Sequence, residues 1–259
     1  MGRKKDRWRE LDALVFQLQK RYGPRALRRR ASPAVETPHV STGFDALDTA
    51  LGIGGVPRGR VTECIGGYTS GKTTVILKTM AQATGLGDVV AFVDLERTFN
   101  PDYAQRAGVD LSRVVLPPAE DPLQALEITR YLVTEQGIGM VVFNDVANLT
   151  GQDSAAPWLS ATLRQIAAAL HQSPCALIFL TTPWHKNVSP RDYPRGFALA
   201  HFASVRLGFE MIRPLRRRDG RRGFRVQVQV LKNKLAAPAR KPVTLDIFFN
   251  GTVESNGII

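Results

Sequence analysis

The residues with the clearest potential for chemistry form one short run, Gly66-Gly67-Tyr68-Thr69-Ser70-Gly71-Lys72-Thr73-Thr74. The run fits the spacing G-x-x-x-x-G-K-[ST], in which backbone N–H groups cradle phosphate oxygens. Lys72 would place a positive charge near the terminal phosphates, and the Thr73 hydroxyl would ligate Mg²⁺. The helix expected to begin at this point adds the positive end of its dipole. The run therefore predicts a binding site for a nucleoside triphosphate.

The flanking sequence supplies the elements that would hold this loop. An apolar strand pattern at residues 61–65 precedes it, and a helical pattern at residues 73–83 follows it. Farther along the chain, apolar runs alternate with helical patterns. The apolar runs cover residues 89–94, 114–116, 140–143 and 176–180, and the helical patterns cover residues 101–107, 122–135 and 158–170. This alternation predicts an α/β fold with a mostly parallel, twisted sheet covered by helices on both faces. Ligands of such sheets bind at the carboxyl ends of the strands.

Beyond residue 181 the pattern changes to that of antiparallel strands. Residues 202–209 and 223–231 alternate between apolar and polar side chains, and a turn at Asp219-Gly220 would join them as a hairpin. A last strand is predicted at residues 244–249. We therefore expect antiparallel strands at one edge of the sheet.

Two helices can be predicted in more detail. A short helix is expected to begin near Ser41 and to end at Leu51. In the helix at residues 122–135, the apolar spacing places four side chains toward the core. These are Leu123, Leu126, Ile128 and Leu132.

The N-terminal segment has a different character from the rest. Apolar residues recur there at alternating steps of three and four, which predicts an amphipathic helix with one apolar seam. The seam consists of Trp8, Leu11, Val15, Leu18 and Tyr22. Gly23-Pro24 would end this helix, and a basic, proline-bearing linker follows. We therefore divide the chain into residues 1–40, a helix and linker for oligomerisation, and residues 41–259, the nucleotide-binding core. The seam needs a surface, either on its own core or on a neighbouring subunit.

The charge of the chain indicates a polyanionic partner. The formal net charge is +12, and much of it is clustered. Residues 1–30 carry eleven lysines and arginines against three acids, and residues 213–225 carry seven arginines against Asp219 alone. Clustered arginines favour nucleic acid as the partner. The alternative is a basic surface that only keeps the protein soluble.

Composition excludes several other classes of protein. No run of about 18 apolar residues is present, so no membrane-spanning helix is expected. The basic N-terminus contains acids and lacks the apolar stretch of an export signal. Cys64 and Cys175 both fall in predicted buried strands, which does not suggest a disulfide framework. These features predict a cytoplasmic protein without a membrane partner.

Several runs besides the phosphate-binding loop resemble the bacterial RecA recombinase family, in the same order and over almost the whole chain. These runs are residues 41–43 (STG), 51–60 (LGIGGVPRGR), 92–96 (FVDLE), 100–104 (NPDYA), 203–207 (ASVRL) and 232–238 (KNKLAAP). The resemblance implies a RecA-like P-loop NTPase core preceded by a short N-terminal helix. The sequence stops soon after this core, so it does not include the family's C-terminal domain, either naturally or because of where the sequence was cut.

The resemblance implies a role for particular residues. Glu96 would orient the water that attacks the γ-phosphate of ATP, and Tyr103 would stack on the adenine. Lys232 and Lys234 would reach the ATP of an adjacent subunit, and the N-terminal helix would dock on a neighbour. Each residue also has a simpler structural interpretation: a helix cap for Glu96, a core residue for Tyr103 and surface charges for the two lysines.

The chain also departs from the family pattern at the ends of two strands. Asn144 stands where the family has an aspartate that supports Mg²⁺, and Asp145 follows one residue later. A neutral amide cannot offset the charge of the metal as a carboxylate does. Either Asp145 takes over this role or hydrolysis is slow, and an Asn144→Asp substitution would then raise the rate. Thr182 replaces the family's glutamine that senses the γ-phosphate, and it has a shorter reach.

The two loops that bind DNA in the family are shorter in this chain. The first corresponds to residues 150–156, and the second to residues 183–197. The second keeps aromatic side chains interleaved with basic ones, which suits base stacking and phosphate contact. These candidate DNA-binding residues are Trp184, Lys186, Arg191, Tyr193, Arg195 and Phe197. The alternative is a surface loop anchored by its aromatic residues.

The resemblance implies a function in homologous recombination, DNA repair and the SOS response. We expect a single-stranded DNA-binding ATPase that uses ATP and Mg²⁺ and assembles into a homo-oligomer or filament. Other repair proteins would be further partners. The alternative is a RecA-like paralogue that binds ATP with weak or no hydrolysis and no strand exchange, and that acts as an accessory factor. A P-loop enzyme for a small molecule has little support, because the candidate loops are basic and aromatic.

Overall fold

The structure is a computed structural model that describes residues 2–23, 37–135, 137–146, 157–183, 199–216, 222–237, 239–249 and 253–256. The contacts within the chain define two units, residues 1–36 and residues 37–259. The predicted DNA-binding loops at residues 150–156 and 183–197 lie outside the described residues, apart from Pro183, and so does the predicted turn at Asp219-Gly220.

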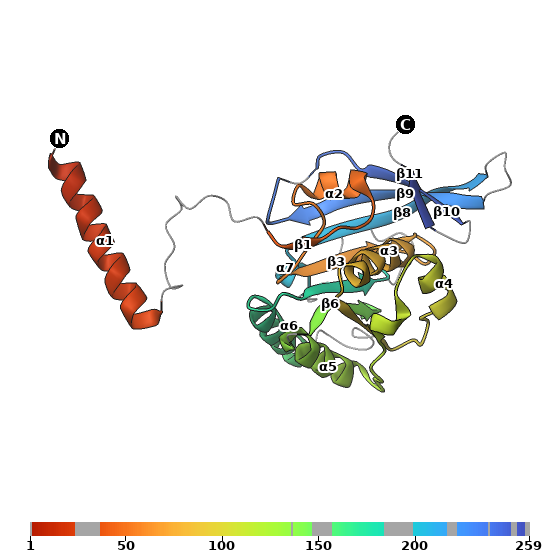
Figure 1. Cartoon of the computed structure of the whole chain (residues 1–259), viewed down its shortest axis with the longest axis horizontal. Helices are drawn as coiled ribbons and strands as arrows, with labels where there is room; N and C mark the ends of the chain where they lie inside the picture. Colours follow the sequence, from red (N-terminus) through yellow and green to blue (C-terminus); the bar gives the residue numbers. More distant parts are fainter. Residues whose placement is uncertain are drawn as a thin grey trace. The chain divides into compact units, whose positions relative to one another are not determined.

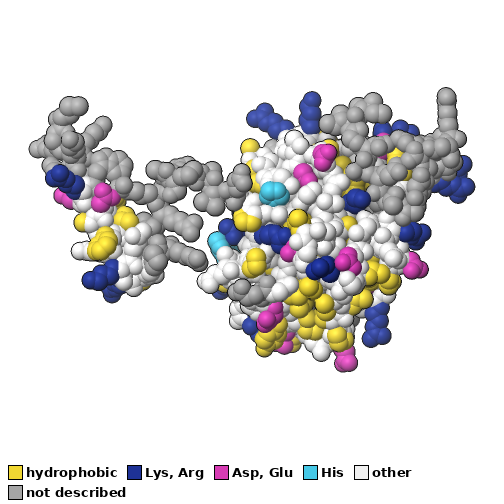
Figure 2. All heavy atoms as spheres, viewed as in Figure 1, with side chains coloured by type: hydrophobic (Ala, Val, Ile, Leu, Met, Phe, Trp, Pro, Cys, Tyr) yellow, Lys and Arg dark blue, Asp and Glu magenta, His cyan; other side chains and the backbone are white. Residues whose placement is uncertain are grey.

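The first unit contains the predicted N-terminal helix, α1 (Gly2–Tyr22). It ends at Gly23, whose φ of 93° lies in the left-handed region that favours glycine. Hydrophobic side chains are visible along this helix in Figure 2. The exposed large ones are Leu11, Leu14, Phe16 and Tyr22.

The second unit is built on a sheet of nine strands in the described residues, in the order β11-β10-β9-β8-β3-β7-β6-β4-β5 (Figure 1). The six strands from β8 to β5 are parallel to one another. They are β3 (Val61–Gly66), β4 (Val89–Asp94), β5 (Val114–Val115), β6 (Ile138–Asn144), β7 (Ala176–Thr181) and β8 (Val205–Arg216). Three strands extend the β8 side in antiparallel pairing: β9 (Arg222–Asn233), β10 (Val243–Phe249) and β11 (Val253–Asn256). The predicted fold class is confirmed.

Helices cover both faces of this sheet and bury two apolar clusters. One cluster lies under α2 (Asp45–Leu51), α3 (Lys72–Gly85) and α4 (Pro101–Arg106). The other lies under α5 (Pro122–Thr134), α6 (Pro157–Leu170) and α7 (Leu199–Phe202). The central strands β3 and β7 are buried along their whole length, which explains the continuous apolar run of β7. Smaller elements complete this unit: β1 (His39–Val40), β2 (Val56–Pro57) and the 3₁₀ helix η1 (Leu111–Arg113).

Three predictions of detail were wrong. Leu123 is 46% exposed, because the buried stripe of α5 runs through Leu126, Thr129 and Val133 instead. The strand expected from residue 202 begins at Val205, since α7 occupies residues 199–202. The strand at residues 243–249 is not the last one, because β11 pairs with it.

Candidate functional site

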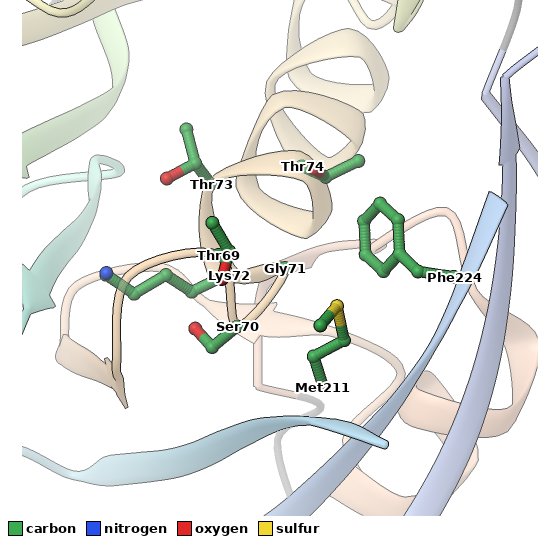
Figure 3. Close-up of a pocket in the computed structure, with 8 residues that line it drawn as sticks. All are labelled: Thr69, Ser70, Gly71, Lys72, Thr73, Thr74, Met211 and Phe224. Atoms are coloured by element: carbon green, nitrogen blue, oxygen red, sulfur yellow. The ribbon is translucent and has the colours of Figure 1, made fainter. Parts of the chain in front are cut away.

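The phosphate-binding loop lies between the end of β3 and the start of α3. Gly71 adopts a φ of 88°, and a Cβ atom there would come within 2.6 Å of the Val226 Cγ2 atom, so only glycine fits this position. The loop borders a cavity of about 260 Å³. Figure 3 shows Lys72 extending to one side of the loop, whereas Met211 and Phe224 stand near Thr74 on the other side. The predicted loop is thus brought together at the carboxyl end of a parallel strand.

Lys72 belongs to a buried chain of hydrogen bonds at the ends of three parallel strands. Its Nζ atom donates to the Thr182 Oγ1 atom at 2.9 Å. Thr182 in turn donates to the Asp145 carboxylate from its hydroxyl and, at 3.1 Å, from its backbone N–H. All three side chains are at most 6% exposed. We call this arrangement the Lys72–Thr182–Asp145 chain.

Burial and nearby charges act in opposite directions on Lys72. Burial lowers the pKa of its ammonium group below the usual value, and the charges of Asp145 and Glu96 act to raise it. Asp145 and Glu96 are therefore the carboxylates that balance this lysine. Thr182 reaches Lys72 despite being shorter than the glutamine of the family pattern.

Asn144 takes a different direction from its neighbour Asp145. Its Nδ2 atom donates to the Asp94 Oδ1 atom at 3.0 Å and to the Thr98 Oγ1 atom at 2.9 Å. Its amide therefore joins the ends of β4 and β6. An aspartate at this position would bring a second carboxylate against Asp94, which a neutral amide avoids.

Tyr103 lies close to the phosphate-binding loop. Its hydroxyl shares a hydrogen bond of 2.6 Å with the Thr74 Oγ1 atom on α3. The local sequence fixes this position, because the Asn100 side chain caps α4 by accepting from the Tyr103 backbone N–H at 2.9 Å and Pro101 begins the helix. Burial raises the pKa of the half-buried Tyr103 phenol.

Lys232 and Lys234 lie at the end of β9 and contact α7. The Lys232 Nζ atom donates to the Ala200 carbonyl oxygen at 2.6 Å, and the Lys234 Nζ atom donates to the His201 carbonyl oxygen at 3.2 Å. Burial, Lys234 and Arg206 together lower the pKa of Lys232 to about 8. The role of these two lysines toward the ATP of a neighbouring subunit stays a prediction.

Sequence reasoning missed one buried ionic group, centred on Glu63. Its side chain is fully buried in β3, its Oε2 atom lies 2.7 Å from the Arg206 Nε atom, and its Oε1 atom accepts from the Thr181 hydroxyl at 3.1 Å. A carboxylate in the middle of an apolar strand requires such partners. The lone glutamate in the run Val-Thr-Glu-Cys-Ile was the available signal.

The described part of the arginine-rich hairpin carries like charges opposite one another. Arg213 on β8 faces Arg225 on β9, and Arg216 faces Arg222. Such cross-strand pairs are destabilising unless an anion lies nearby. Asp246 supplies one, since its carboxylate accepts two hydrogen bonds from Arg225, at 2.6 and 2.7 Å. Figure 1 shows the far ends of β8 and β9 reaching beyond the other strands.

The loop suits the phosphates of a nucleotide. The buried Ser70 Oγ atom has no hydrogen-bond partner among the described residues, and the side chain of Thr73 in the same loop is exposed. No group of three or more His, Cys, Asp or Glu side chains in the described residues could hold a metal by itself. The Thr73 hydroxyl as a single protein ligand fits Mg²⁺, which is commonly held by few protein ligands together with nucleotide phosphates and water.

The sheet and the loop define a P-loop nucleotide-binding protein, and comparison with known proteins gives its family. The family model of the RecA N-terminal domain matches residues 9–254. Protein RecA of Brucella anthropi is 37% identical over 270 residues, which cover 97% of this chain and 74% of that protein. Protein RecA of Methylobacterium radiotolerans is 38% identical over 271 residues, which cover 98% of this chain and 74% of that protein. The chain belongs to the RecA family.

This membership confirms the resemblance and the RecA-type function in DNA recombination and repair. It implies nucleotide binding, single-stranded DNA binding and filament formation. The comparisons give no support to the alternative of an accessory paralogue. In the part of the chain that the structure describes, no helix is long and apolar enough to cross a membrane.

Proposed function

We propose that this protein binds ATP and Mg²⁺ in its phosphate-binding loop and hydrolyses the ATP at an interface between subunits that are assembled on single-stranded DNA. The observation that carries this proposal is the Lys72–Thr182–Asp145 chain. It ties the lysine of the loop to Thr182, which directly precedes the candidate DNA-binding loop at residues 183–197. A change at the phosphates would therefore act directly on the start of that segment.

The roles in hydrolysis follow from the placement of the side chains. The loop N–H groups and Lys72 hold the phosphates, and Thr73 is the ligand for Mg²⁺, which would neutralise charge on the phosphate oxygens when bound. Glu96 orients the attacking water. Tyr103, held by Thr74, supports the adenine. Lys232 and Lys234 come from the adjacent subunit.

We further propose that Asp145, and not Asn144, supplies the negative charge that the family pattern places on the strand β6. Asp145 lies within the electrostatic reach of Lys72, whereas the Asn144 amide is directed to Asp94 and Thr98. Asp145 and Thr182, hydrogen-bonded to each other, would thus replace the aspartate and the glutamine that the family pattern has at the ends of these two strands. Thr182, at one departure from the family pattern, contacts Asp145, which directly follows the other departure at Asn144.

Assembly would use apolar surface that the single subunit leaves exposed. The short strand β5 is the last strand of the sheet, and Val115 and Leu116 are 43% and 49% exposed there. Figure 2 shows that hydrophobic side chains also gather on one face of the core. The seam of α1 and this sheet edge both expose apolar side chains, so we propose that residues 1–40 of one copy pack on the core of the next.

DNA binding would use the aromatic and basic residues from Trp184 to Phe197 and the arginines of the β8–β9 hairpin. Arg213, Arg216 and Arg222 are exposed, and their cross-strand repulsion would be relieved by phosphates. If phosphate contacts dominate, the affinity for single strands falls steeply as salt is added. A flat dependence on salt would contradict this assignment.

The experiment that tests the proposal is an ATPase assay with and without single-stranded DNA, together with sizing in the presence of a non-hydrolysable ATP analogue. We expect DNA to stimulate hydrolysis and the analogue to produce large assemblies. The Lys72→Ala variant should lose ATP binding in calorimetry. Hydrolysis that is unaffected by DNA, or unchanged ATP affinity of this variant, would contradict the proposal.

A further inference from the structure

The short helix α7 ends in an unusual arrangement of hydrogen bonds. The Ala203 backbone N–H donates to the Leu199 carbonyl at 2.8 Å, as in a regular helix. The next N–H, that of Ser204, turns away and donates to the Val61 carbonyl of β3 at 2.8 Å. The carbonyl of Ala200, which Ser204 would serve in a longer helix, therefore needs another donor.

Lys232 of β9 and Lys234, just beyond the end of β9, provide the missing donors. Lys232 donates to the carbonyls of Ala200, at 2.6 Å, and His201, at 3.4 Å. Lys234 donates to the His201 carbonyl at 3.2 Å. Cations at the carbonyl end of a helix are favourable, because these oxygens carry partial negative charge. The two ammonium groups thus replace the next turn of the helix.

The surroundings of these lysines explain why carbonyls are suitable partners. Arg206 faces Lys232 across the β8–β9 pair, and the buried Glu63 carboxylate is bonded to Arg206. Lys232 therefore has positive neighbours in Arg206 and Lys234, and it is partly removed from water. The carbonyl oxygens of α7 compensate this loss of hydration, and their partial negative charge is favourable beside these cations.

We propose that the carbonyl oxygens of Ala200 and His201, at the end of α7, form a binding seat for the ammonium groups of Lys232 and Lys234. The two lysines occupy this seat, and so position α7, whenever a neighbour's nucleotide does not hold them. Helix α7 directly follows the candidate DNA-binding segment in the chain. If both lysines reach phosphates in trans, the carbonyls of Ala200 and His201 lose these donors. The seat itself is independent of the proposed function, whereas the exchange with a nucleotide rests on it.

Hydrogen–deuterium exchange of the nucleotide-free full chain tests the seat. In the Lys232→Met/Lys234→Met variant, amides of residues 199–204 should exchange about tenfold faster than in the wild type, because charge-assisted hydrogen bonds are lost. Amides of β8 and β9 should change little, and the Lys241→Met control, an exposed lysine, should match the wild type. The Lys232→Arg/Lys234→Arg variant should retain most of the protection. Unchanged exchange of residues 199–204, or equal acceleration throughout β8 and β9, would overturn the proposal.

The exchange of partners is tested in the wild type on single-stranded DNA. Residues 199–204 should exchange several-fold faster with a non-hydrolysable ATP analogue than with ADP, since only the former offers a γ-phosphate to the lysines. Equal or slower exchange would overturn the sharing of the lysines between α7 and the nucleotide. Neither measurement depends on ATPase activity. A failure of this proposal can therefore be distinguished from a failure of the proposed ATP hydrolysis.

Discussion

Thr182 offers the sharpest test of the Lys72–Thr182–Asp145 chain, through the substitution Thr182→Val. Valine keeps the shape of threonine and removes only the hydroxyl, which accepts a hydrogen bond from Lys72 and donates one to Asp145. The backbone N–H of residue 182 can still donate to Asp145. The substitution therefore separates the two charged groups without removing either charge.

The expected cost follows from these contacts. A hydrogen bond to a charged group contributes about 1.5–3 kcal/mol, so the loss of two would cost about 3 kcal/mol or more. Direct approach of the Lys72 ammonium to the Asp145 carboxylate would recover part of this. We expect a net loss of about 2–3 kcal/mol, which lowers the unfolding midpoint by about 5–10 °C in a chain of this size.

A double-mutant cycle with Asp145→Asn, measured by urea unfolding, isolates the interaction. Thr182→Val and Asp145→Asn should couple by about 1–2 kcal/mol, because they share a buried hydrogen bond. The matched control is Thr181→Val, whose hydroxyl donates to Glu63 instead, and which should be additive with Asp145→Asn to within about 0.5 kcal/mol. Additivity of the Thr182→Val pair would refute the chain of contacts described above.

Three further predictions concern neighbouring positions. Asn144→Asp would set a carboxylate against Asp94 where the amide now donates at 3.0 Å, so repulsion would raise the pKa of one carboxyl of the pair in the folded state. Without Mg²⁺, stability should therefore fall as the pH rises above the unfolded carboxyl pKa of about 4, and stability equal to the wild type at pH 8 would contradict this. Lys232, with a pKa of about 8, should show a midpoint near that pH in competitive acylation, whereas a midpoint near 10, the ordinary value of a lysine side chain, would be inconsistent with its burial. Gly71→Ala should lower the free energy of unfolding, measured in urea, by about 2 kcal/mol, because the backbone there is left-handed and the new Cβ would clash with Val226. Gly67→Ala should be tolerated, because a Cβ there would meet nothing within 4 Å. Equal stability of the two variants would argue against the loop geometry.

Much of the fold was predictable because its signals are local. The strand at residues 89–94 and the phosphate-binding loop with its flanking elements can be read from consecutive residues. Helix α7 and strand β11 were not predicted, since each has only four residues and α7 is completed by bonds to distant elements. Leu123 misled the prediction because one apolar residue in the first turn of a helix does not define its buried face.

The site was predictable only in its individual residues. The sequence identified Lys72, Asp145 and Thr182 separately, and it left open whether Asp145 could compensate for Asn144. Lys72 lies 110 residues from Thr182, and Asp145 lies 37 residues from Thr182, so no local pattern encodes these contacts. The same holds for Glu63 and Arg206, which are 143 residues apart. The roles of Glu96, Tyr103 and the two interface lysines remain proposals that rest on the family pattern and on their placement.

The central claim, a nucleotide site shared between subunits, is tested most directly by mixing two inactive variants. Lys72→Ala removes the lysine of the loop, and Lys232→Met removes a lysine that acts in trans. In an assembly of equal parts, about a quarter of the sites combine an intact loop with intact lysines from the neighbour, because the interface is head-to-tail. The account predicts that DNA-stimulated ATPase activity returns to about a quarter of the wild-type rate. A mixture no more active than its two components would contradict it.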